Sequence, residues 1–167
     1  MNKYIFSALL WAFSICFADD SIAGFWKTID PDTKKPQSVV AVYEYKGKYY
    51  GRIIGTYNKS GQVDETMYAP KDRAPGIVGN PYYCGLDIIW NLRLRDNDRF
   101  RGKICNPQAG KVYDAELWVE DGNLIVRGMV WMFGANRTWL PFTDKEFSSH
   151  FKKPDVKKFV PVIPETN

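Results

Sequence analysis

Short runs in which apolar and polar residues alternate follow one another from Gly24 to Phe142. The clearest run spans 86–95, where the apolar positions are Leu86, Ile88, Trp90, Leu92 and Leu94. A period of two residues is typical of a β-strand with one buried face. No stretch of this region shows the periodicity of a long amphipathic helix. The pattern therefore predicts an all-β domain.

Turn residues divide this region into eight predicted strands. Their ranges are 24–29, 37–45, 48–57, 86–95, 99–105, 111–120, 123–132 and 137–142. The strongest turn signal is Asp121-Gly122, a dipeptide that favours a two-residue hairpin. Such a turn places Trp118 opposite Ile125, and it places Glu116 opposite Arg127 as an ion pair. About eight antiparallel strands joined mostly by hairpins favour a meander closed into a barrel, because closure removes exposed edges.

The N-terminus has the pattern of a cleavable signal peptide over residues 1–18. Lys3 is the only charged residue before Asp19, and an apolar stretch from Tyr4 to Phe17 follows it. Small residues at Cys16 and Ala18 have the spacing that a signal peptidase recognises. The apolar stretch is shorter than the roughly 20 residues that span a bilayer, so a retained anchor is the weaker alternative. We expect a periplasmic or secreted protein that begins at Asp19 and has no membrane span after processing.

The expected mature chain of 149 residues divides into a barrel domain, residues 19–142, and a C-terminal tail, residues 143–167. The segment 58–83 is rich in glycine and proline and has no periodicity, which is typical of a lid, a binding loop or a covering segment. Prolines at 154, 161 and 164 prevent a long helix in the tail, which we interpret as docked or loose.

Charge and candidate chemistry exclude several functions. The net charge is +4, and removal of Lys3 with the signal peptide leaves +3, without a block of like charges, so we expect no nucleic-acid partner. His150 is the only histidine, and it lies in the tail. No catalytic set, metal-ligand spacing or phosphate-binding loop is present in the sequence. We therefore predict no enzymatic activity, no metal and no cofactor.

Two cysteines remain after Cys16 is removed with the signal peptide, and an oxidising compartment favours a disulfide between Cys84 and Cys105. The alternation of the strands argues against this pairing. Cys84 shares parity with apolar Leu86, whereas Cys105 shares parity with charged Lys103, so the two sulfurs start on opposite faces unless Gly85 forms a bulge.

Gly24-Phe25-Trp26 at the first strand and Arg137 on the last strand resemble the signature of lipocalin-type barrels. The resemblance implies that Trp26 closes one end of the barrel and that the guanidinium of Arg137 stacks on its indole, which is a favourable cation–π pair. A longer series of motifs resembles the exported bacterial family known as domain of unknown function 2147. These motifs include Gly47-Lys48-x-Tyr50-Gly51, Gly102-Lys103-Ile104-x-Asn106-Pro107, Gly110-Lys111-x-Tyr113 and Arg127-Gly128. This resemblance implies a lipocalin-like (calycin-type) barrel and an exported protein, and it implies no activity.

Eight-stranded barrels often hold one small ligand, although some are filled by their own side chains. We predict an interior ligand site lined by Leu86, Ile88, Trp90, Phe100, Leu117, Val126 and Val130. Such a lining favours an apolar or amphipathic ligand, with its polar head near the segment 58–83. The alternative is a filled barrel that serves as an interaction or scaffold module for an envelope protein partner.

Overall fold

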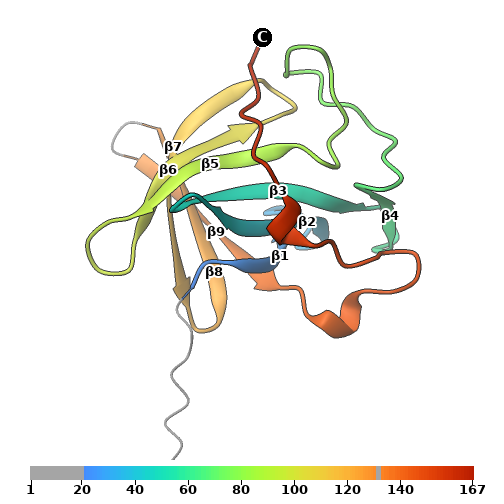
Figure 1. The fold of residues 1–167 in the computed structure, drawn as a ribbon, viewed down its shortest axis with the longest axis horizontal. Helices are drawn as coiled ribbons and strands as arrows, with labels where there is room; N and C mark the ends of the chain where they lie inside the picture. Colours follow the sequence, from blue (N-terminus) through green and yellow to red (C-terminus); the bar gives the residue numbers. More distant parts are fainter. Residues whose placement is uncertain (1–20, 131–132) are drawn as a thin grey trace, which may run out of the picture.

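The computed structural model describes the backbone of residues 21–130 and 133–167 and the side chains of 21–129 and 134–167. The predicted signal peptide lies outside these described residues. The described chain is all-β, with nine strands and two single-turn 3₁₀ helices (Figure 1). The strands are β1 (Gly24–Ile29), β2 (Pro36–Tyr45), β3 (Lys48–Tyr57), β4 (Val63–Thr66), β5 (Asp87–Leu94), β6 (Phe100–Asn106), β7 (Lys111–Glu120), β8 (Asn123–Val130) and β9 (Phe133–Pro141). None of the helices found among these residues is long and apolar enough to cross a membrane.

Eight of these strands close into an antiparallel barrel, which confirms the predicted fold class. The order around the barrel is β2-β1-β9-β8-β7-β6-β5-β3, and β3 pairs with β2 to complete the ring. Strand β4 was not predicted. It pairs with the end of β3 beyond the point where β3 leaves β5, so it extends the sheet without entering the ring.

The hairpin of β7 and β8 has the predicted register. Trp118 faces Ile125, and Glu116 faces Arg127. The expected ion pair across this hairpin is wrong, however, because the Glu116 carboxylate accepts a 2.8 Å hydrogen bond from Arg101 on β6. A residue in a central strand has neighbours on both sides, and hairpin register alone does not select between them.

Strand β5 departs from the predicted alternation because its pairing shifts register on both sides. Ile89 faces Gly51 on β3 and Ile104 on β6, whereas Trp90 faces Lys103. Asn91 has a φ of +56°, a conformation that asparagine tolerates better than most residues. The resulting bulges turn successive residues of β5 toward faces that a simple two-residue period does not predict.

The C-terminal tail is docked on the outside of the barrel (Figure 1). It contains the two 3₁₀ helices, η1 (Asp144–Glu146) and η2 (Val156–Lys158). Phe159 packs its ring 5.1 Å from that of Tyr43 on β2 and 4.4 Å from the guanidinium of Arg52 on β3. Near the end of the chain, Thr166 forms a β-bridge with Ile77. Both faces of β2 are buried because the tail covers the outer one.

Asp87, at the start of β5, binds the tail to the barrel wall. Its carboxylate is 1% exposed and accepts hydrogen bonds from Arg52 at 2.7 and 3.0 Å, from the Tyr43 hydroxyl at 2.9 Å and from the Val162 amide at 2.9 Å. Burial, together with the negative charge of Asp87, raises the pKa of Tyr43, so its phenol stays protonated and keeps donating. These hydrogen bonds compensate the buried carboxylate for the loss of its hydration.

The structure does not join the two cysteines, so it contradicts the predicted disulfide. Cys84 and Cys105 are free and buried. Cys84 lies in the segment before β5, beside the tail, whereas Cys105 lies in β6 and faces Val112 of β7. Burial raises the pKa of the Cys84 thiol to about 12, and it also raises the pKa of Cys105. Neither thiol is activated as a nucleophile.

Replacement of Asp87 by alanine tests the connection between tail and barrel. Removal of one partner of a buried ion pair leaves Arg52 uncompensated, so we expect the free energy of unfolding to fall by about 3–5 kcal/mol. Asp114→Ala is the matched control, because it removes an ion pair with Lys103 whose side chains are 60% and 48% exposed. We expect a loss of about 1 kcal/mol or less there. Equal losses in urea titrations of the two variants would contradict the role given to Asp87.

Thiol reactivity tests the state of the cysteines. In the folded protein at pH 8, we expect iodoacetamide to label Cys84 and Cys105 slowly, because burial raises the pKa of both thiols. In 6 M guanidinium chloride without reductant, both should be labelled completely, as mapped by peptide mass spectrometry. Failure of labelling in denaturant until a reductant is added would restore the disulfide.

Candidate functional site

The barrel has two unlike ends, because successive connections of a meander alternate between them. Tight hairpins at 46–47 and 121–122 lie at one end. The opposite end carries the connection 107–110 between β6 and β7 and the long segment 58–86 between β3 and β5. We call these the hairpin end and the loop end.

A pocket of about 340 Å³ lies inside the barrel toward the loop end. Strands β6 to β9 supply its lining, which consists of Ile104, Cys105, Asn106, Tyr113, Val126, Gly128, Ala135, Arg137 and Trp139. Val126 faces Arg137, and Gly128 faces Ala135, so alternate residues of neighbouring strands point to the same interior space.

The pocket exists because the residues at its centre are small. Gly128 faces Ala115 on β7 and Ala135 on β9. A Cβ atom added at Gly128 would meet no heavy atom within 4 Å, so this glycine borders open space. Toward the hairpin end, the interior is filled by buried side chains of the same strands, among them Leu117 and Leu124. The barrel is thus filled in one half and hollow in the other.

Three polar side chains interrupt the apolar lining. The Asn106 carboxamide oxygen accepts hydrogen bonds from the backbone amides of Gln108 and Ala109, at 3.0 and 3.3 Å, and thereby holds the β6–β7 turn. Tyr113 is half-buried, and Arg137 is exposed at the mouth. Among the residues whose side chains are described, neither the Tyr113 hydroxyl nor the Arg137 guanidinium has a hydrogen-bonding or ionic partner. None of the described lining residues is acidic.

Trp26 belongs to the buried core, and its indole nitrogen donates a 2.9 Å hydrogen bond to the carbonyl of Ile22. Gly24 has a φ of +151°, a conformation that residues with a side chain rarely adopt, which gives a physical reason for the glycine of the Gly-x-Trp motif.

The structure does not bring Trp26 and Arg137 together as a closing pair. Trp26 pairs with Pro141 on β9, and Arg137 is four residues away, roughly 13 Å along the strand toward the loop end. The predicted stacking is therefore wrong, and Arg137 belongs to the pocket.

Of the predicted ligand-site residues whose side chains are described, only Val126 lines this pocket. Phe100 and Leu117 face one another in the filled part of the barrel. Trp90 is buried, but its register with Lys103, whose neighbour on β7 is Asp114, places it on the outward side of the sheet and away from the pocket. The other three residues also lie elsewhere: Ile88 in the register shift of β5, Leu86 beside the tail, and Val130 at the end of β8, where its side chain is outside the described residues.

Sequence reasoning missed Gly128, Tyr113 and Trp139 as lining residues. The register between β8 and β9 would have identified Trp139 as a lining residue. In this register Trp139 faces Leu124 and Arg137 faces Val126, so both side chains lie on the same face as Val126. The residues between these strands, Trp131-Met132, carry no turn signal from which to derive that register.

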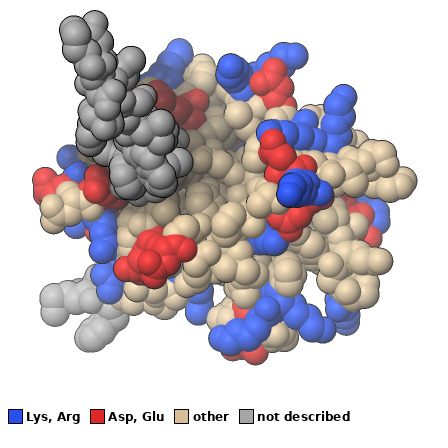
Figure 2. Space-filling view, turned by 90° about the horizontal axis from the view of Figure 1, so that it is seen from below, with Lys and Arg blue, Asp and Glu red and all other residues tan. Residues whose placement is uncertain are grey.

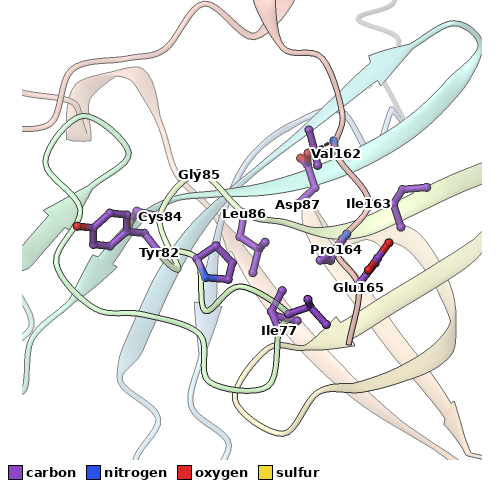
Figure 3. Close-up of a pocket in the computed structure, with 12 residues that line it drawn as sticks. Ile77, Tyr82, Cys84, Gly85, Leu86, Asp87, Val162, Ile163, Pro164 and Glu165 are labelled. Carbon is purple, nitrogen blue, oxygen red and sulfur yellow. Dashed lines mark hydrogen bonds between the residues drawn. The ribbon is translucent and has the colours of Figure 1, made fainter. Parts of the chain in front are cut away.

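A second pocket, of about 540 Å³, lies outside the barrel between the long segment and the tail (Figure 3). Ile77 and Leu86 form one side of it, and Val162 to Glu165 of the tail form the other. The segment 58–83 contributes to this pocket and not to the lining of the barrel pocket. A backbone bond from Val78 to Glu165 and one from Asn167 to Gly76 attach the segment to the tail.

Other potential sites offer less organised chemistry. His150 borders a surface hollow that Glu65 and Glu146 also line, but the described side chains form no group of three or more His, Cys, Asp or Glu that could hold a metal ion. The Glu65 carboxylate accepts hydrogen bonds from Thr56 and from the backbone amides of Lys71 and Asp72, so it serves to hold the loop. On the face in Figure 2, acidic and basic side chains are interspersed.

Comparison with known proteins agrees with this architecture. Protein HP1028 from the human pathogen Helicobacter pylori, whose structure is described as belonging to the lipocalin family, superposes with a TM-score of 0.59. The alignment covers 76% of this chain and 86% of that protein at 20% sequence identity, so the likeness concerns the fold. No curated protein matches the chain. Residues 24–140 match the family described as "Uncharacterized protein conserved in bacteria (DUF2147)", and the chain therefore belongs to this family.

Proposed function

We propose that this protein is an exported, non-enzymatic barrel that binds one small amphipathic molecule in the pocket at its loop end. The observation that carries the proposal is the hollow half of the barrel, a pocket of about 340 Å³ bordered by Gly128. Small-molecule sites are typically concave, mostly apolar and furnished with a few polar groups, and this pocket has that composition.

The size of the pocket limits the ligand. Binding pockets for small molecules generally measure about 300–1,000 Å³, and this one is near the lower limit. It therefore suits a single alkyl chain or a small ring system. Ile104, Val126 and Trp139 would contact the apolar part of such a ligand.

The alternative function is that of an interaction module for an envelope partner. It is favoured by exposed apolar residues in the tail and the long segment, namely Val160, Val162, Ile163 and Val78 at 61, 68, 48 and 50% exposure. This alternative requires no ligand in the barrel, so a binding experiment separates the two.

A titration with decanol and decanoate, followed through tryptophan fluorescence, tests the ligand proposal, because Trp139 lines the pocket. We expect saturable binding to the native protein. Gly128→Phe should abolish it, because the added ring would occupy space that no atom now fills, and the glycine has no positive φ that would strain the substitution. Asn136→Phe is the matched control, since it places the same ring on the outward, exposed face of β9 opposite Arg127.

Folding of each variant is checked by circular dichroism and thermal unfolding. Absence of binding by the folded native protein would overturn the ligand proposal and leave the interaction module. Equal binding by the native protein and Gly128→Phe would mean that any site lies outside this pocket.

Export is tested by the mass of the protein recovered from the periplasm or medium of a bacterial host. The sequence pattern of residues 1–18 leads us to expect a chain that begins at Asp19. An exported chain that retains residues 1–18 would contradict this expectation.

A further inference from the structure

We infer that the ligand's polar end is an oxyanion, a carboxylate or phosphate, and that Arg137 binds it at the mouth of the pocket. This inference rests on the proposed function and adds to it the chemical class of the ligand. It also moves the polar head away from the segment 58–83, which does not line the pocket.

The position of Arg137 is unusual for a charged residue in this barrel. Its side chain belongs to the inward set of β9, with Ala135 and Trp139 as inward neighbours on the same strand and Val126 facing it on β8. All three neighbours are small or apolar, and none of the described residues that line the pocket is acidic. In the part of the chain that the structure describes, no acidic group neutralises this guanidinium, which is exposed to water at the mouth.

Several other arginines have acidic partners, whereas the Nε of Arg127 on β8 has no hydrogen-bond partner among the described residues. Arg52 binds Asp87, and Arg99 and Arg101 bind Glu116. The acidic partners compensate the charges of these arginines on the outward face of the barrel. Arg137 differs from these arginines because it lines the apolar pocket, where its N–H donors have no partner among the described side chains.

The guanidinium suits an oxyanion because its planar array of N–H donors forms two parallel hydrogen bonds to a carboxylate or phosphate. The half-buried Tyr113 hydroxyl lines the same pocket and can donate a further bond. An entering alkyl chain would displace water from Ile104, Val126 and Trp139, and the lower local polarity would strengthen the bond between Arg137 and the anion. The geometry therefore favours an anionic amphiphile over a neutral or cationic one.

The test compares four ligands with the same chain, namely decanoate, decyl phosphate, decanol and decylamine, in isothermal titrations of the native protein. We expect at least one of the anions to bind about 10- to 100-fold more tightly than decanol, as for hydrogen bonds to charged groups. The stronger anion identifies the head as carboxylate or phosphate. Decylamine should bind most weakly.

Arg137→Gln should remove the advantage of the anion and leave the affinity for decanol unchanged. Arg137→Lys should keep part of it, because the charge remains but the paired donors are lost. Arg127→Gln is the matched control, since Arg127 lies on the adjacent strand and the outward face, opposite Asn136. It should bind every ligand as the native protein does.

Two results would overturn the inference. One is native binding of decanol as tight as that of either anion, and the other is an unchanged ratio of anion to decanol affinity in folded Arg137→Gln. If decanol binds and Gly128→Phe blocks it, the proposed function stands while the assignment of the head group fails. If none of the four ligands binds, both fail.

Discussion

Closure of the sheet is the constraint on which the other features of this protein depend. When β3 pairs back with β2, every strand acquires an inner and an outer set of side chains, and each set must be accommodated separately. The inner set must fill the barrel or leave a cavity, and the outer set must face water or be covered. In this chain the inner set is bulky toward the hairpin end and small around Gly128, so the cavity lies toward the loop end.

The outward-facing side chains explain why the tail is docked on the barrel. Ala41 and Tyr43 on β2, together with Arg52 and Asp87, would expose apolar surface and a charge pair on the outside of the barrel if nothing covered them. Phe159 packs over Tyr43 and Arg52, and the Val162 amide completes the hydrogen bonding of Asp87. The tail also pairs with the long segment at Ile77, so two pieces of chain without long strands are held against the same wall. Neither piece contributes to the described lining of the barrel pocket.

The candidate site combines an apolar cavity with a cation that has no acidic partner among the described residues, and these two properties arise from different parts of the sequence. Gly128 and Ala135 create the space, whereas Arg137 supplies the charge at its edge. The family to which the chain belongs is uncharacterised, and the likeness to the Helicobacter pylori protein extends to the fold only. The functional proposal therefore depends on the chemistry of the pocket itself.

Local sequence by itself determined the strands and the tight hairpins, because alternation and turn residues act within a few positions. Six of the eight predicted strands have the observed bounds to within one residue at each end, among them 48–57 and 111–120, and the register at Asp121-Gly122 is the predicted one. Tertiary structure decided what depends on contacts between distant segments. The bulges of β5 turned Trp90 outward, the separation of Cys84 from Cys105 left both thiols free, and strand pairing placed Arg137 in the pocket instead of beside Trp26. The physical reason is that alternation along a strand shows which of its residues share a face, whereas the register between strands decides which residues of neighbouring strands that face contacts.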